Sequence, residues 1–419
     1  MGLFLYNLIF IRGYSLAIAL ASAFNKKARL FRDGRKNLFN DLKLAFHEND
    51  KPVFWLHAAS LGEFEQGRPV MEAFRQQFPG HRILLTFYSP SGYEVRKNYN
   101  GADDVFYLPV DTKGNASRFL DIVKPDIAVF VKYEFWYHYI SQSLERGVHF
   151  ISISTILRPG HFLLSGRGKF LAIRIKGINH FFTQDTLSAD LLGKLSIDQL
   201  TIAGDTRYDR VADIAAQAKE IPIVDRFLDG KEAIIIGSSW SSDMEKLIPV
   251  IEAYKEDLKF VIAPHNINEQ EIAGLGKELK VSSVRYSDAQ NRDDLDSFSV
   301  LIIDNIGMLS SLYKYGKYAY IGGAFRGALH NTLEAAVYGV PVFFGKHDNN
   351  HKFREAIDLI DNGGGFQFDT SEELIALIKD FQENADSWQK AGDASRNQVE
   401  NSRGATAKIM NYLEEIIQA

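Results

Sequence analysis

The stretch Tyr318–Gly345, which reads YAYIGGAFRGALHNTLEAAVYGVPVFFG, limits the fold of this chain more than any other. It begins with an apolar run, Tyr318–Ile321, that is typical of a buried strand and is followed by a pair of glycines. A helical pattern covers Asn331–Tyr338, and a second apolar run covers Val340–Phe344. The order of strand, glycine loop, helix and strand predicts a βαβ unit. The N-terminus of its helix can bind phosphate, because its first N–H groups have no partner within the helix.

The same alternation of apolar runs and helical segments recurs along the whole chain. In the first half the apolar runs are Val53–Ala59, Arg82–Phe87, Val105–Leu108, Ile127–Val131 and Phe150–Ser154. In the second half they include Ala233–Ile236, Lys259–Ala263 and Ser299–Ile303. Strands that alternate with helices predict parallel sheets, and 419 residues exceed one ordinary core. The sequence therefore predicts an α/β protein with two doubly wound, Rossmann-like domains.

We place the domain boundary near Asp205, which gives an N-terminal domain of residues 25–205 and a C-terminal domain of residues 206–419. The last helix is free to pack back on the N-terminal domain. Neither domain carries the G-x-G-x-x-G motif of dinucleotide binding. Because ligands of such sheets bind beyond the carboxyl ends of the strands, we expect two lobes that face a cleft.

Composition excludes several classes of chemistry. The chain has no cysteine, so disulfides, thiolate metal sites and cysteine nucleophiles are ruled out. Its net charge of −5 argues against a nucleic-acid partner, which usually selects a basic surface. His57, His265 and His330 lack the spacing of metal ligands. His347 and His351 are four residues apart, but they lie in an Asp/Asn-rich loop without an acid at the position that a zinc protease would need, and we predict no metal site.

Residues 1–24 form a separate, apolar segment. Leu3–Phe24 holds a single charge, Arg12. A basic cluster follows at Lys26, Lys27, Arg29, Arg32, Arg35 and Lys36. An apolar run of this length can span a bilayer or lie in its interface, and the basic cluster would hold the main body on the cytoplasmic side. The alternative is a buried helix of a globular domain.

Two glutamates stand where a catalytic or binding carboxylate would face a ligand, one in each half. Glu63 follows the run Val53–Ala59, where a general base could take a proton from a hydroxyl group. Glu334 lies one turn into the helix of the opening stretch, where it could bind both hydroxyls of a ribose. Each glutamate also stands three residues after Ser60 or Asn331, respectively, so each is equally compatible with a capping box that only stabilises its own helix.

Further candidates follow other strands. Glu134 comes after Ile127–Val131 and is a second acid or an ordinary helix-start residue. Ser238 and Ser239 precede a helix and form an anion site or an N-cap. Arg207 and Arg158 could neutralise a phosphate or a carboxylate, although single arginines are usually surface residues.

Taken together, these residues resemble those of a known family, the 3-deoxy-D-manno-oct-2-ulosonic acid (Kdo) transferases of lipid A assembly. These are membrane-attached glycosyltransferases of the GT-B fold. The most specific matches are Trp55–Glu63 (WLHAASLGE) and the pair Gly322-Gly323 followed by His330–Glu334 (HNTLE). Lesser matches are Glu134–Trp136, Gly204–Asp209, Ala263–His265 and Gly307–Leu309.

The resemblance implies a donor, an acceptor and a role for each matched residue. It implies that Glu63 is the catalytic base and that Glu134 and Arg207 support the transition state. The implied contacts to cytidine monophosphate (CMP) are Pro264, His265, Gly307, Met308, Leu309, Asn331, Thr332, Leu333 and Glu334. Ser238, Ser239 and Arg158 remain candidate contacts to phosphate or carboxylate. The implied reaction is inverting transfer of Kdo from CMP-Kdo to a lipid A precursor of the lipid IVA type at the cell inner membrane, with no metal or other cofactor. The N-terminal domain would bind the acceptor and the C-terminal domain the CMP-sugar.

The sequence departs from the family pattern at several of these positions. His265 replaces an arginine, Met308 a glutamate and Arg207 a lysine, while Thr332, Ala335 and Tyr137 replace prolines. Three other functions stay open on the residues alone. They are a GT-B transferase that uses a UDP- or ADP-sugar, a UDP-sugar epimerase of the same fold, and a membrane-bound protein that binds nucleotide sugars without catalysis.

Overall fold

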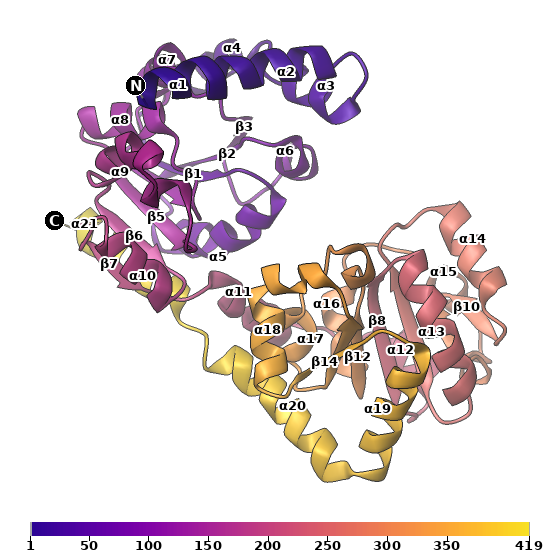
Figure 1. The fold of residues 1–419 in the computed structure, drawn as a ribbon. Coiled ribbons are helices and arrows are strands. Elements are labelled where there is room, and N and C mark those ends of the chain that lie inside the picture. The colour runs from indigo at the N-terminus through magenta and orange to yellow at the C-terminus, as the bar shows by residue number, and fades with distance from the viewer. Residues whose placement is uncertain (1, 419) are drawn as a thin grey trace. The chain divides into compact units, whose positions relative to one another are not determined.

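The computed structural model describes residues 2–418 and divides the chain into two compact units. One unit comprises the chain up to Asp209 together with the segment from Arg403, and the other comprises Arg210–Ser402. Each unit contains a seven-stranded sheet in which every strand pairs in parallel with its neighbours (Figure 1). The prediction of two Rossmann-like domains is confirmed.

The first unit is built on a sheet with the strand order β3-β2-β1-β4-β5-β6-β7. Its strands are β1 (Val53–Ala58), β2 (Arg82–Phe87), β3 (Asp104–Tyr107), β4 (Ile127–Val131), β5 (His149–Thr155), β6 (His180–Thr183) and β7 (Leu200–Ile202). Its helices after the N-terminal segment are α3 (Lys26–Asp33), α4 (Leu38–Phe46), α5 (Leu61–Gln77), α6 (Pro90–Arg96), α7 (Lys113–Val123), α8 (Tyr137–Glu145), α9 (Lys169–Ile175) and α10 (Thr186–Gly193). Helix α11 (Thr206–Ala216) runs from this unit into the next.

The central strand β1 explains why the sequence there is apolar throughout instead of alternating. All six of its residues are buried. Val53 and Trp55 point into one core, and Phe54, Leu56 and Ala58 point into the other. A parallel strand covered on both faces needs apolar side chains on both faces, and this rule identified β1 from the sequence.

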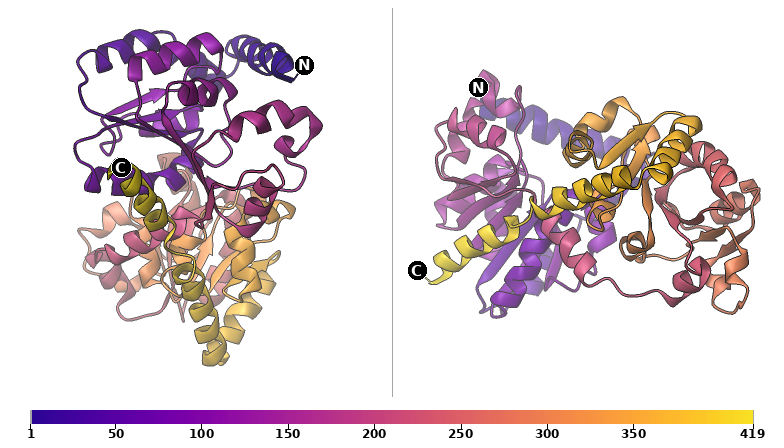
Figure 2. Two further views of the ribbon diagram at one scale, coloured as in Figure 1. Left: turned by 90° about the vertical axis from the view of Figure 1, so that its left-hand side faces the viewer. Right: turned by 90° about the horizontal axis from the view of Figure 1, so that it is seen from below.

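The C-terminal helix α21 (Ala405–Gln418) belongs to the first unit. Ile409 and Leu413 are fully buried in the same core as Phe64 of α5. Asp209 accepts hydrogen bonds from the backbone N–H groups of Gly404 (2.6 Å) and Thr406 (2.7 Å), and so fixes the start of this helix. In Figure 2, α21 is the yellow helix that ends at the label C.

The N-terminal segment is one continuous helix made of α1 (Gly2–Leu5), a π-helical stretch (Tyr6–Gly13) and α2 (Tyr14–Ala21) (Figure 1). Its length and apolar composition would allow it to cross a membrane, and little of it is buried. Tyr6 donates a hydrogen bond to the fully buried carboxylate of Asp111 (2.6 Å), and Tyr14 stacks on Tyr88 at 6.3 Å between ring centroids. The helix is therefore docked along the first unit, with its other side exposed.

The second unit has the strand order β10-β11-β9-β8-β12-β13-β14. Its strands are β8 (Ala233–Ser239), β9 (Lys259–Pro264), β10 (Ser283–Arg285), β11 (Val300–Ile302), β12 (Tyr318–Ile321), β13 (Val342–Gly345) and β14 (Gly365–Phe368). Its helices are α12 (Pro222–Leu228), α13 (Ser241–Tyr254), α14 (Glu269–Glu278), α15 (Tyr286–Ala289), α16 (Leu309–Leu312), α17 (Leu333–Ala336), α18 (Arg354–Asp361), α19 (Ser371–Glu383) and α20 (Ala385–Glu400).

The stretch Tyr318–Gly345 forms the predicted strand, loop, helix and strand, but its helix is shorter than the sequence indicated. Only Leu333–Ala336 is α-helical, and the loop before it contains a 3₁₀ turn at Ala324–Arg326. Gly322 lies so close to β8 that a β-carbon there would meet the Ser238 carbonyl oxygen at 2.2 Å. A side chain at this position would push β12 away from β8, which explains the glycine.

Candidate active site

Glu63 lies in the first turn of α5, directly beyond the carboxyl end of β1. Its carboxylate accepts a short hydrogen bond from the Ser60 hydroxyl and lies 3.6 Å from the Lys132 ammonium. The Ser60 side chain makes no capping bond to the helix backbone. The Ser60 hydroxyl therefore binds the Glu63 carboxylate instead of capping the helix, and the carboxylate itself pairs with a cation from the turn after β4.

Glu134 lies near Glu63 because β1 and β4 are adjacent and parallel. The turn after β4 places Lys132 in the left-handed backbone region (φ 65°), which sharply redirects the chain. Burial, and next the charge of Glu63, raise the pKa of Glu134 to about 7. The carboxyl ends of β1 and β4 thus carry two carboxyl groups and one ammonium group, and one of the carboxyls holds a proton close to neutral pH.

Arg207 lies at the start of α11 in the same unit. Its guanidinium donates two hydrogen bonds to one oxygen of Asp205, at 2.9 and 2.7 Å. Gln66, one turn after Glu63 on α5, donates to the same oxygen at 3.0 Å. Burial alone would raise the pKa of Asp205, but the charge and hydrogen bonds of Arg207 outweigh it and hold that pKa below its usual value. Asp205 thereby links the arginine to the helix that carries Glu63.

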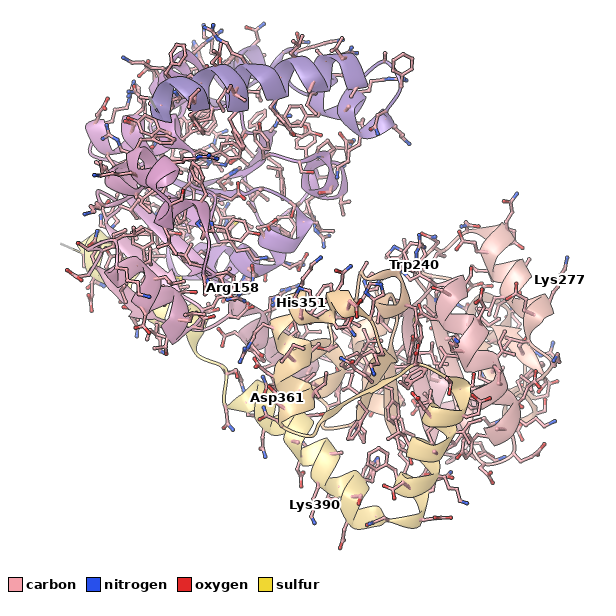
Figure 3. All side chains as sticks on the ribbon, viewed as in Figure 1. Arg158, Trp240, Lys277, His351, Asp361 and Lys390 are labelled. Atoms are coloured by element: carbon pink, nitrogen blue, oxygen red, sulfur yellow. The ribbon has the colours of Figure 1, made fainter. Side chains whose placement is uncertain are left out.

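Arg158 is the most exposed of the predicted site residues in this unit. Arg158 is labelled in Figure 3. It lies beyond β5, is half exposed, and pairs with Asp185 at 3.3 Å. Asp185 is the N-cap of α10. The structure gives Arg158 a role at the end of a helix and shows no contact between it and Glu63, Glu134 or Arg207 among the bonds of residues 2–418.

In the second unit, the predicted anion site at Ser238 and Ser239 adjoins the start of α13. Ser238 has a left-handed backbone (φ 52°), and the hydroxyl of the buried Ser239 has no hydrogen-bond partner among the described residues. The N-cap of α13 is Trp240. Its backbone N–H donates to the buried carboxylate of Asp243 (2.8 Å). Asp243 also accepts from the Gly323 N–H (3.0 Å) and the Tyr320 hydroxyl (2.6 Å).

Pro264 and His265 end β9 beside this carboxylate network. The His265 ring stacks on Trp240 with 4.0 Å between centroids and lies 4.7 Å from the His330 ring. The His265 N–H donates to the Ser239 carbonyl at 2.9 Å. The structure therefore brings together three segments that the sequence picked out separately, namely Ser238–Ser239, Pro264–His265 and the start of His330–Glu334.

The remaining predicted CMP contacts form a second group in the same unit. Gly307 has φ 96°, Met308 is the N-cap of α16, and Leu309 approaches the backbone of Gly237 at the end of β8. The Tyr338 hydroxyl donates to the Ser310 carbonyl at 2.8 Å and so joins this segment to the segment of α17.

Within the α17 segment, the Asn331 amide donates to Glu334 at 3.3 Å. Thr332 and Leu333 are fully buried, and the Thr332 hydroxyl has no partner among the described residues. These two side chains shape the site from within, whereas Asn331 and Glu334 are partly exposed.

Residues 2–418 contain no group of three or more His, Asp or Glu side chains placed to hold a metal ion. Four residues of the site were absent from the sequence predictions: Gln66, Trp240, Asp243 and Arg326, whose guanidinium lies over the Trp240 ring. Each acts across a long sequence separation, so that spacing gave no signal for it.

Two sheets of this topology, each with polar side chains beyond the carboxyl ends of its central strands, define the class of GT-B proteins. Residues 36–210 match the family model described as 3-deoxy-D-manno-octulosonic-acid transferase (kdotransferase). A bifunctional glycosyltransferase/methyltransferase of Fusobacterium nucleatum is 25% identical over 98% of this chain, and the chain spans 61% of that protein. A 3-deoxy-D-manno-octulosonic acid transferase of Aquifex aeolicus is 26% identical over 80% of this chain and 87% of its own length.

The fold also resembles solved structures of other enzymes. A UDP-GlcNAc 2-epimerase of Neisseria meningitidis superposes with a TM-score of 0.58 over 87% of this chain and 100% of its own, at 13% identity. That likeness shows the fold alone. The family match identifies residues 36–210 as a Kdo transferase domain, and together with the two sequence relatives it indicates a glycosyltransferase. A domain of this kind implies a sugar-nucleotide donor and a glycolipid acceptor.

Replacing Glu134 with glutamine should change how stability depends on pH. With a pKa of about 7, folded Glu134 keeps a proton that the unfolded chain has already released. Stability should therefore fall as the pH rises from about 5 to about 8, since the native state binds more protons than the unfolded state. Glu134→Gln removes this pH-dependent contribution to stability. The melting temperature of the wild type should therefore fall relative to that of the variant between about pH 5 and pH 8. The surface variant Glu145→Gln is the control, and a wild-type-minus-Glu134→Gln difference that stays constant with pH would contradict the assignment.

Proposed function

We propose that this chain is an inverting glycosyltransferase that moves Kdo from CMP-Kdo to a lipid A precursor of the lipid IVA type in lipopolysaccharide core biosynthesis. The family match over residues 36–210 and the Aquifex aeolicus relative support the sugar and its donor. The observation that carries the chemistry is the Glu63 carboxylate, held by Ser60 and Lys132 next to Glu134. A carboxylate paired with a cation beside a carboxyl group of raised pKa is a common arrangement for acid–base catalysis.

In this proposal Glu63 is the general base. It takes the proton from a primary hydroxyl of the acceptor as the hydroxyl oxygen attacks the anomeric carbon of Kdo. The bond between that carbon and the phosphate oxygen breaks on the opposite face, and CMP leaves with the bonding electrons. Attack and departure on opposite faces invert the configuration at the anomeric carbon.

Negative charge grows on the phosphate oxygen as this bond breaks, so the reaction needs donors and cations around it. Glu134 carries a proton near neutral pH and can donate a hydrogen bond. Arg207 carries a fixed charge, oriented by Asp205. The contacts to CMP would come from the second unit, through Pro264, His265, Gly307–Leu309 and Asn331–Glu334.

An epimerase of the same fold is the alternative from another enzyme class. The structural likeness to the Neisseria meningitidis enzyme is at the level of fold, whereas the family match and the sequence relatives favour transfer. An epimerase would convert a UDP-sugar with no acceptor present.

Glu63→Gln should lower the rate of Kdo transfer at least about 100-fold, because a general base typically contributes two to four orders of magnitude. The rate is measured as CMP release that depends on the lipid acceptor, at saturating CMP-Kdo. Glu65→Gln is the matched control, since Glu65 is on the same helix but pairs with Arg96 (3.0 Å). Near wild-type transfer by Glu63→Gln would exclude Glu63 as the base, even if the enzyme proves to be a Kdo transferase.

We further propose that the helix Gly2–Ala21 lies in the membrane interface instead of spanning the bilayer, on the cytoplasmic face of the inner membrane. The helix is tied to the first unit at three points, which are Tyr6 to Asp111, Tyr14 to Tyr88, and Ser22 to Arg32 (2.7 Å). Tyr6 and Ser22 are about 24 Å apart along a helix, and both ends of that length stay on one domain.

A spanning helix would have to carry one of these ends across roughly 30 Å of hydrocarbon. The exposed side of the helix is apolar, as an interfacial helix requires, at Phe4, Ile9, Phe10, Leu16 and Leu20. The exposed Lys26, Lys27 and Arg29 follow directly and would contact anionic lipid headgroups.

An epitope tag before Met1 should be removed by protease in inverted inner-membrane vesicles, whose cytoplasmic face points outward. An interfacial helix keeps its N-terminus on that face, whereas a spanning helix would protect the tag inside the vesicle. A tag after the last residue, following α21, is the control and should be removed in either case. Protection of the N-terminal tag while the C-terminal tag is lost would establish a spanning helix and overturn this proposal.

A further inference from the structure

Arg326 is a cation at the carboxyl end of β12 that the matched motifs do not include. It ends the 3₁₀ turn Ala324–Arg326, and its guanidinium lies 4.1 Å above the centre of the Trp240 ring. The side chain is exposed, and no carboxylate of residues 2–418 is in ion-pair contact with it. An unpaired arginine stacked on an aromatic ring is oriented but keeps its hydrogen-bond donors available for a ligand.

The loop that carries Arg326 is closely packed, which constrains the backbone on both sides of the arginine. A β-carbon on Gly327 would meet the Asn349 amide nitrogen at 2.5 Å, and Gly327 has φ 68°. A β-carbon on Gly323 would meet the Ala328 carbonyl oxygen at 2.4 Å. Only glycine fits at positions 323 and 327. Arg326 lies between them, at the exposed end of the 3₁₀ turn.

The backbone around Arg326 is a weaker anion site than the sequence indicates, because Asp243 occupies it. The N–H groups of Trp240 and Gly323 point to one oxygen of the buried Asp243 carboxylate, at 2.8 and 3.0 Å. These are two of the donors that a helix start and a glycine loop would otherwise offer to phosphate. The negative charge of a phosphate bound here must therefore be neutralised by a side chain.

The two histidines of the ring stack do not supply that charge near neutral pH. Burial, and next the charge of Arg326, lower the pKa of His265. Burial, and next the charge of His265, lower the pKa of His330 to about 4. Of the four neighbouring side chains Trp240, His265, His330 and Arg326, only the arginine is charged at pH 7.

We propose that Arg326 binds the phosphate of the nucleotide donor and that Trp240 is the positioning residue that holds the guanidinium over the start of α13. The unpartnered hydroxyl of the buried Ser239, adjacent to Trp240, is a second donor available to the same phosphate. The inference rests on the proposed CMP-sugar donor. It assigns the positive charge that faces the phosphate to Arg326 in the glycine loop, and not to His265, which is neutral.

The test is calorimetric titration of the full chain with CMP and, separately, with cytidine, which lacks the phosphate. The wild type should bind CMP more tightly than cytidine. Arg326→Gln should weaken CMP binding about ten- to hundredfold, as expected for loss of a charged hydrogen bond, and should leave cytidine binding within about twofold. Arg292→Gln is the matched control, because Arg292 is an exposed arginine of the same unit that pairs with Asp294 at 2.7 Å.

Trp240→Leu removes the ring but no charge. It should weaken CMP binding less than Arg326→Gln, again without an effect on cytidine. If Arg326→Gln keeps the full preference for CMP over cytidine, Arg326 does not bind the phosphate, although the donor assignment stands. An equal loss of CMP and cytidine binding would show that Arg326 only shapes the pocket, and would overturn the inference. If the wild type binds neither nucleotide, the proposed CMP-sugar donor is itself wrong, and the inference fails with it.

Discussion

The buried carboxylate of Asp243 organises the end of the second sheet on which the proposed donor site depends. It accepts hydrogen bonds from Tyr320, from the backbone of Gly323 and from the backbone of Trp240. These three groups belong to β12, to the loop after it and to the start of α13, so a single carboxylate holds together the segments that follow two adjacent strands. A buried carboxylate is stable only when such donors surround it. The same bonds that stabilise Asp243 occupy N–H groups that a phosphate could use.

In the proposed reaction, the two sheets have different roles. In the first unit, the ends of β1 and β4 bring an ion-paired carboxylate, Glu63, next to a carboxyl group with a raised pKa, Glu134. In the second unit, the ends of β8, β9 and β12 gather aromatic rings and one unpaired guanidinium. The carboxyl groups of the first unit suit proton transfer, and the rings and guanidinium of the second unit suit recognition of a nucleotide. Transfer from a nucleotide-activated sugar requires both.

Much of the fold could be predicted from the sequence, because parallel strands buried on both faces are continuous apolar runs. The strands β1, β2, β3, β4, β5, β8, β9, β11, β12 and β13 were found in this way. The short strands β6, β7, β10 and β14 were missed, since three or four residues with mixed polarity, such as Ser283–Arg285, become strands only through pairing with a neighbour. The helix expected over Asn331–Tyr338 was too long, since only Leu333–Ala336 is α-helical.

The site was predictable only where a residue follows a recognisable strand. Glu63 and Glu134 were found because they follow β1 and β4, and their proximity comes from strand order, which the sequence does not state. Trp240 and Arg326 were missed because their contact joins two loops that are adjacent only in the folded sheet. The roles of Glu63, Arg207 and the CMP contacts remain predictions, supported by the family match over residues 36–210 and by the sequence relatives.

The most direct test of the central claim is a comparison of sugar donors with the purified full chain in detergent–lipid micelles. A tetraacylated glucosamine disaccharide bisphosphate serves as the acceptor, and the products are read by mass spectrometry. The account predicts that CMP-Kdo alone, and not a UDP- or ADP-sugar, adds the mass of one or more Kdo residues to the lipid, with release of CMP in equal amount. Conversion of a UDP-sugar without the acceptor, together with no mass gain from CMP-Kdo, would contradict it.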